Sequence, residues 1–152
     1  MRRINYNKHC TDMTANTLFR IVRILSIGGI ILAIYLLWEQ ATQPAIPPCT
    51  INSYINCDAV ISGAVAKTFG IPTPLYGLVG YLFIFTSTLA KKRKILLTIA
   101  TFGLGFCLWI AYVELFQLHV ICPICIGCQL IMISVFTLSI ILNRIKSEKK
   151  NL

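Results

Sequence analysis

Four long apolar stretches, separated by polar or basic segments, make up most of the chain. They cover roughly residues 21–38, 72–90, 95–118 and 124–142. A helix needs about 20 predominantly apolar residues to cross a bilayer, and each stretch approaches or reaches that length. The pattern therefore predicts an all-α membrane protein, a bundle of four transmembrane helices.

The connection between the first two stretches, residues 39–71, is expected to form an outer loop. Three prolines between residues 44 and 48 stop regular structure in its first part. Residues 57–70 then carry apolar positions at helical spacing and end in Gly70, which predicts a short amphipathic helix with a glycine cap. That helix is too short to cross the bilayer, so we expect it to lie over the bundle at the membrane surface.

Small residues occur in the middle of the first two apolar stretches. Gly28 and Gly29 lie in the first, and Gly77 and Gly80 lie about one turn apart in the second. Glycines let the backbones of neighbouring helices approach closely in a membrane. We therefore expect both pairs at helix–helix contacts.

Composition and charge agree with a membrane protein and orient it. The chain has 152 residues, which favours one domain, but 57% hydrophobic and 12% charged residues exclude an ordinary soluble domain. Of its 14 lysines and arginines, all but Lys67 lie in three clusters, within residues 2–23, 91–94 and 144–150. The positive-inside rule places all three clusters in the cytoplasm. The net charge of +9 thus reports topology and gives no support to nucleic-acid binding.

This topology divides the chain into three parts. Residues 1–17 are polar and without periodicity, and are expected to form a mobile cytoplasmic tail. Residues 18–143 form the membrane domain, and residues 144–152 a basic cytoplasmic tail. The first apolar stretch follows a basic start, as in a signal peptide, but it is longer than the usual core of about 7–15 residues and is kept as a transmembrane helix.

Four of the seven cysteines fall on the outer side of the membrane in this topology. They are Cys49, Cys57, Cys122 and Cys125. The outer side is oxidising in most cells, and four cysteines permit three pairings, so spacing alone leaves the connectivity open. Two structural disulfides that brace a membrane subunit are one interpretation. Cys107 and Cys128 lie deeper and are expected to be packing residues.

The setting of Cys122 favours a second interpretation, an exchanging disulfide. Pro123 suits the first position of a helix, which makes Cys122 the N-cap, with its thiolate facing the positive end of the helix dipole. Cys125 follows one turn later on the same face. Cys57 can begin its own short helix in the same way, and a helix N-terminus favours the reactive thiolate.

Two metal-based alternatives fall short. Zinc bound by Cys122, Cys125 and Cys128 lacks a fourth ligand, and structural zinc sites use four. Haem held by His9 and His119 is excluded because the topology places these side chains on opposite sides of the bilayer. We therefore expect no metal.

Glu114 lies close to the outer end of the third apolar stretch. A carboxyl group within a membrane segment is costly and usually faces the bundle interior or a functional cavity. So near the end of a helix, contact with water at the interface explains it equally well. Both interpretations stay open at this stage.

A series of motifs resembles the vitamin K epoxide reductase family, and specifically its prokaryotic members. The resemblance runs from about residue 18 to 143, and the order of the four outer cysteines is its most specific part. The motifs are Cys49-x7-Cys57-Asp58, Ser62, Phe69-Gly70-Ile71-Pro72, Gly77 with Gly80-Tyr81, and Tyr112-Val113-Glu114-Leu115-Phe116 leading to His119-Val120-Ile121-Cys122-Pro123-Ile124-Cys125.

The resemblance implies a four-helix bundle around a quinone of the ubiquinone or menaquinone class. Cys49 would exchange with a separate thioredoxin-fold protein on the outer side, and Cys57 would attack Cys122 of a Cys122–Cys125 disulfide. Cys125 would then deliver electrons to the quinone. The resemblance also implies a bacterial inner-membrane enzyme, with both termini cytoplasmic and the cysteine pairs periplasmic, that supports disulfide formation in secreted proteins.

Quinone contacts are expected at Ser62, Thr73 and Cys125. The family often has a second serine after Ser62, where this chain has Gly63. Animal members have an asparagine where this chain has Thr73, and Cys128 replaces the polar residue that usually follows the active cysteines. These departures argue against the alternative activity, reduction of a quinone epoxide, because thiol-to-quinone transfer needs only the cysteines and an apolar pocket.

Overall fold

The computed structural model describes the backbone of residues 2–42, 57, 60, 67–68 and 70–150, and most side chains from residue 14 to 145 within these ranges. Helices dominate it. They are α1 (Arg2–Thr42), α3 (Thr73–Leu89), α4 (Arg93–Tyr112) and α5 (Pro123–Lys150), with a π-helix, η1 (Val113–Leu118), that continues α4.

Three helical segments are long and apolar enough to cross a membrane. They are Thr14–Thr42 of α1, Arg93–Leu118 of α4 with η1, and Pro123–Ile145 of α5. The fourth apolar helix, α3, is shorter, with 17 residues. The helices begin where the sequence has helix-start features: Pro74 lies in the first turn of α3, and Pro123 opens α5. The predicted all-α membrane fold is confirmed at this level.

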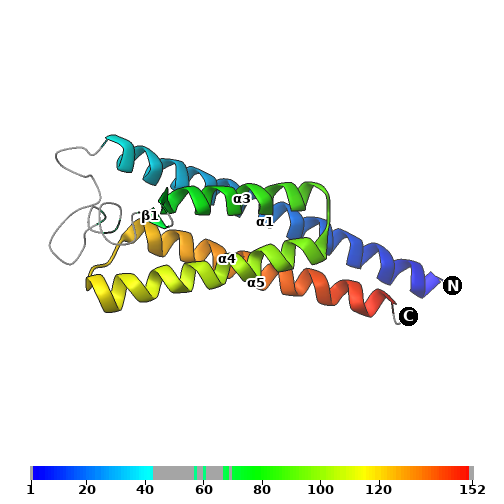
Figure 1. Cartoon of the computed structure of the whole chain (residues 1–152). Helices are drawn as coiled ribbons and strands as arrows, with labels where there is room; N and C mark the ends of the chain where they lie inside the picture. Colours follow the sequence, from blue (N-terminus) through cyan, green and yellow to red (C-terminus); the bar gives the residue numbers. More distant parts are fainter. Residues whose placement is uncertain (1, 43–56, 58–59, 61–66, 69, 151–152) are drawn as a thin grey trace.

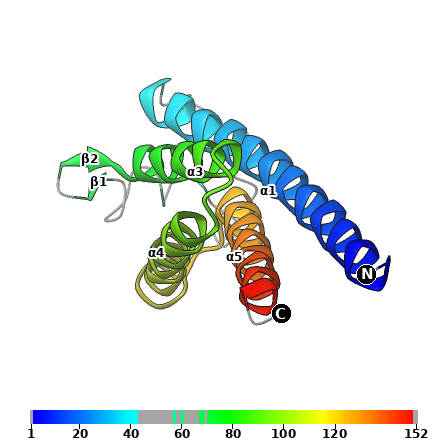
Figure 2. The ribbon, with the colours of Figure 1, turned by 90° about the vertical axis from the view of Figure 1, so that its right-hand side faces the viewer.

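The helices lie lengthwise beside one another in a ring (Figures 1 and 2). α1 packs against α3 and α5, and α4 packs against the same two helices from the other side. Both chain ends lie at one end of the bundle, together with the α3–α4 turn around Lys91 (Figure 1). The turn between η1 and α5, which contains Cys122, lies at the opposite end, so the length of the bundle separates it from the basic segments.

Only part of the glycine prediction holds. A side chain at Gly29 would collide with the ring of Tyr81 on α3, so Gly29 does allow α1 and α3 to approach closely. Gly77 and Gly80 were also expected at a helix contact, and this is wrong. No atom lies within 4 Å of the Cβ position of either residue, because both border an open space inside the bundle.

Two segments before α3, residues 1–17 and 57–70, also differ from the structure expected for them. The tail expected at residues 1–17 has a helical backbone from Arg2, continuous with α1. The short helix expected over residues 57–70 does not reach Gly70, because β1 (Lys67–Thr68) pairs antiparallel with β2 (Ile71–Pro72). Gly70 supplies a positive φ of 83° in the hairpin turn, a conformation that glycine adopts without strain. The rest of that predicted helix lies mostly outside the described residues.

Candidate functional site

The N-terminus of α5 sets the position of Cys122. The backbone reverses at His119, which has a positive φ of 52°, and α5 starts at Pro123. The Cys122 carbonyl accepts the Ile126 N–H at 3.1 Å, and the Cys122 sulfur accepts the Cys125 N–H at 3.4 Å. These are the two bonds of an N-cap residue, so the predicted capping role of Cys122 is confirmed.

Three cysteines meet at this helix start. The sulfurs of Cys57 and Cys122 are 3.3 Å apart, although 65 residues separate them in the chain. Cys57 and Cys122 have no exposed surface, and Cys125 is 9% exposed. They share an apolar cluster whose other buried members are Val60, Ile110, Val113 and Val120. The packing therefore shields the sulfur atoms of Cys57 and Cys122 from water.

The cysteines differ in oxidation state and acidity. Cys122 and Cys125 are free thiols, whereas Cys57 is disulfide-bonded to a cysteine outside the described residues. Hydrogen bonding from the Cys125 side chain holds the pKa of the Cys122 thiol below its usual value, and the N–H groups of Cys125 and Ile124 add to this effect against the opposing effect of burial. The Cys122 thiolate, the form that attacks disulfides, is thereby favoured.

This geometry suits thiol–disulfide exchange. A free thiol with a lowered pKa lies in contact with one sulfur of a disulfide, which is the approach that precedes formation of a mixed disulfide. A Cys57–Cys122 bond would form as the existing Cys57 disulfide breaks, and its former partner would leave as a thiolate. The reverse reaction uses the same atoms.

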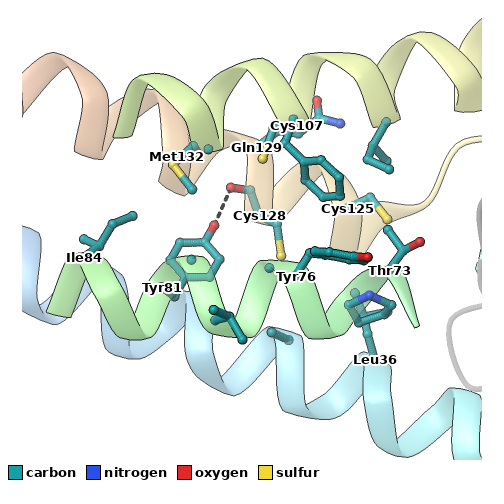
Figure 3. Close-up of a pocket in the computed structure, with 18 of the residues that line it drawn as sticks. Leu36, Thr73, Tyr76, Tyr81, Ile84, Cys107, Cys125, Cys128, Gln129 and Met132 are labelled. Carbon is teal, nitrogen blue, oxygen red and sulfur yellow. Dashed lines mark hydrogen bonds between the residues drawn. The ribbon is translucent and has the colours of Figure 1, made fainter. Parts of the chain in front are cut away.

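A cavity of about 350 Å³ extends from Cys125 into the bundle. Its walls are mostly apolar side chains of α1, α3, α4 and α5. Figure 3 shows Thr73, Tyr76 and Cys125 together at one end, and Ile84 and Met132 toward the other. Gln129 and Cys128 supply further polar atoms. An apolar pocket of this size with a few polar groups is typical of a site for a small organic ligand.

The cavity owes its shape to α3. Gly77 and Gly80 leave its wall without side chains, and the Tyr81 hydroxyl crosses the bundle to donate to the Cys128 carbonyl at 2.9 Å. The part that Tyr76 and these glycines play here was not predicted from the sequence. A face of small residues next to tyrosines within an apolar helix could have indicated a cavity, but the same pattern also occurs at helix contacts.

The structure brings most of the predicted site residues together. Cys57 and Cys122 are in contact, and Cys125 links that contact to the cavity, which Thr73 also lines. Cys49 and Ser62 lie outside the described residues. The two cysteines expected to serve only in packing, Cys107 and Cys128, are free thiols that also line the cavity.

Glu114 belongs to the interior. It is 3% exposed, which decides between the two interpretations left open by the sequence. Its carboxyl group interacts with the Cys125 side chain. The site therefore contains an acid as well as three cysteines.

A family model, described as the vitamin K epoxide reductase family, matches residues 20–140. The chain belongs to this family. Members of the vitamin K epoxide reductase family are oxidoreductases of membranes that use a quinone as substrate, and the apolar helices of this chain agree with an integral membrane protein. No curated protein sequence matches the chain. The resemblance inferred from the cysteine motifs is confirmed.

Proposed function

We propose that this protein is a quinone-dependent thiol oxidoreductase. It takes electrons from a separate thioredoxin-fold protein through Cys49 and Cys57, and passes them to Cys122 and Cys125 and then to a quinone. Disulfide formation in secreted proteins depends on it. The observation that carries the proposal is the 3.3 Å contact between the Cys57 and Cys122 sulfurs, beside a cavity that Cys125 lines.

The first half of the reaction is thiol–disulfide exchange. The Cys57 thiolate attacks Cys122 of a Cys122–Cys125 disulfide, so that a Cys57–Cys122 bond forms and Cys125 leaves with the electron pair. Cys49 then attacks Cys57, and Cys122 is released as a thiol. The product has an outer disulfide and two inner thiols, which agrees with the disulfide-bonded Cys57 and the free Cys122 and Cys125 of the structure.

The second half takes place at the cavity. A quinone bound there supplies an acceptor for two electrons and two protons, which the Cys122 and Cys125 thiols release as they form their disulfide. Cys125 places its sulfur at the cavity wall, and Thr73, Tyr76 and Gln129 carry polar hydrogens suited to orienting carbonyl oxygens. The apolar walls exclude water and suit a ring of the ubiquinone or menaquinone class.

Topology supports the same direction of transfer. The 17 residues of α3 extend about 26 Å, close to the hydrocarbon thickness of about 30 Å, so α3 serves as a fourth span beside the three longer helices. The basic segments then face the cytoplasm, and Cys57 and Cys122 face the periplasm of a bacterial inner membrane. A secreted thioredoxin-fold protein reaches the cysteines from that side.

The decisive experiment is quinone-coupled thiol oxidation in membranes that contain the protein. Quinone reduction is followed after addition of a reduced thioredoxin-fold protein, with Cys49, Cys57, Cys122 and Cys125 each replaced by serine. Every replacement should abolish turnover, and Cys122→Ser should also prevent the Cys57–Cys122 mixed disulfide. Full turnover in Cys125→Ser would exclude that residue as the electron donor.

The competing hypothesis is a membrane subunit braced by two disulfides. It requires stable bonds, whereas Cys122 and Cys125 are free thiols in the structure. Structural disulfides are hard to reduce, and exchanging ones are labile. If a mild reductant left every disulfide of the oxidised, folded protein intact, the braced subunit would replace the proposed enzyme.

A further inference from the structure

Glu114 is a buried acid whose hydrogen bonding is incomplete. One of its carboxyl oxygens, Oε1, is buried and has no hydrogen-bond partner among the residues that the structure describes. Only 3% of the surface of Glu114 is exposed. A buried charged carboxylate without compensating partners is costly, so the carboxyl has a strong tendency to carry a proton.

The backbone holds Glu114 firmly in this position. It lies in the first turn of η1, and π-helical turns are rare and occur frequently at functional sites. The Glu114 carbonyl accepts the N–H groups of both His119 and Val120, the latter at 3.2 Å. The same short segment therefore fixes the acid and leads directly into the Cys122 turn.

The titratable groups that interact with Glu114 are thiols of α4 and α5. The carboxyl interacts with the Cys125 side chain, and Cys107, Cys122 and Cys128 are near enough to interact with its charge. In the part of the chain that the structure describes, no lysine, arginine or histidine forms an ion pair with it. Its chemical partner is thus the Cys125 sulfur.

Opening of the Cys122–Cys125 disulfide produces a thiolate that a neighbouring acid can protonate. When Cys57 attacks Cys122, Cys125 is expelled as a thiolate into an apolar environment, where an unpaired anion is costly. Cys125 lines the cavity and Glu114 does not, so the acid can interact with Cys125 without itself lining the proposed quinone site. A proton can then pass between Glu114 and the sulfur while a quinone is bound.

We infer that Glu114 is the acid–base catalyst for Cys125. In the opening step, the Cys57 thiolate, the Cys122–Cys125 disulfide and the protonated Glu114 give a Cys57–Cys122 disulfide, the Cys125 thiol and the Glu114 carboxylate. In the reverse step, the carboxylate takes the proton back as Cys125 attacks Cys122. This inference rests on the proposed function, because it assigns a proton to one of its exchange steps.

The test measures disulfide opening alone, without quinone. Purified protein with an oxidised Cys122–Cys125 pair is mixed with a reduced dithiol, and the Cys125 thiol that appears is trapped and quantified over a range of pH. Glu114→Gln keeps the shape of the side chain but has no acidic proton, and should slow opening roughly 100-fold. In the wild-type protein the opening rate should fall at high pH, where the Glu114 carboxyl loses its proton. This fall should be absent in Glu114→Gln. Glu114→Asp should restore part of the rate.

Glu39→Gln is the matched control, because Glu39 is the other fully buried glutamate among the described residues and lies at the end of α1. It should keep the wild-type rate and pH profile. A Glu114→Gln variant that also keeps both, while wild-type protein opens normally, would overturn the inference alone. Failure of the wild-type disulfide to open would instead overturn the proposed function.

A second measurement does not depend on whether a Glu114 variant folds. An infrared difference spectrum between the oxidised and opened states of wild-type protein should show the loss of one buried carboxylic acid band. The Glu39→Gln variant should show the same loss of the band, which means that the band does not come from Glu39. If opening left the carboxylic acid bands of the wild-type protein unchanged, Glu114 would not be the proton donor.

Discussion

At the scale of single residues, Cys122 combines three local properties that act together. It caps α5, its sulfur accepts the Cys125 N–H at 3.4 Å, and it lies 3.3 Å from the Cys57 sulfur. The first two follow from Pro123 and the cysteine spacing. The pKa of the thiol is lowered mainly by the Cys125 side chain, and the Cys125 N–H adds to this effect. The third brings this thiol to the atom with which it exchanges, so acidity and position serve one reaction.

The hydrogen bond from the Cys125 side chain has a measurable effect on Cys122. Cys125→Ala removes that donor, so the pKa of Cys122 should rise toward its ordinary value. In wild-type protein the thiolate is present at lower pH, and the variant should therefore need a higher pH for the same rate of alkylation at Cys122. Site-resolved mass spectrometry after brief iodoacetamide treatment measures this rate. Cys128→Ala, which keeps the Cys125 side chain, should leave the profile in place.

At the scale of helices, α3 combines a close contact with one neighbour and an open space beside it. Tyr81 packs closely against Gly29 of α1 and reaches Cys128 of α5 with its hydroxyl. Gly77, one turn before Tyr81, and Gly80, the residue before it, face open space instead. The helix thus joins two neighbours at Tyr81 and leaves room beside Cys125, which is how an antiparallel bundle can contain a cavity without losing its packing.

Filling this space should weaken quinone use without unfolding the protein. Gly80→Leu places a branched side chain in the cavity, and we expect the KM for quinone to rise about tenfold, which corresponds to about 1.4 kcal/mol of binding. Gly105→Leu is the matched control, since Gly105 is exposed on α4 and also has no atom within 4 Å of its Cβ position. Both substitutions improve helix propensity equally. A normal KM in Gly80→Leu would show that quinone binds elsewhere.

At the scale of the whole molecule, the bundle separates two kinds of surface. The α3–α4 turn and both chain ends share one end, and the connection from η1 to α5, which contains Cys122, lies at the other (Figure 1). Connections at alternating ends bring Cys57 and Cys122 together although all of α3 and α4 lies between them in sequence. In the proposed function, this contact connects the outer thiols with the quinone site.

The proposed orientation predicts which end of the bundle is accessible from outside. Lys91 and His119 are both exposed, and they lie at opposite ends. A membrane-impermeant maleimide added to spheroplasts of an expressing bacterium should label the cysteine of His119→Cys directly. The cysteine of Lys91→Cys should be labelled only after permeabilisation, with labelling assigned by peptide mass spectrometry. The opposite pattern would invert the topology and place the cysteine pairs in the cytoplasm.

The sequence by itself determined the helical membrane fold, the N-cap at Cys122 and the family, because apolar periodicity, helix capping and cysteine order depend on residues that are neighbours in the chain. It could not determine that Gly77 and Gly80 border a cavity while Gly29 meets Tyr81, since the same small residues suit both roles. Nor could it place Glu114 in the interior. Only the tertiary structure decided these points and the contact of Cys57 with Cys122, because helix rotation and packing set which side chains meet across the bundle.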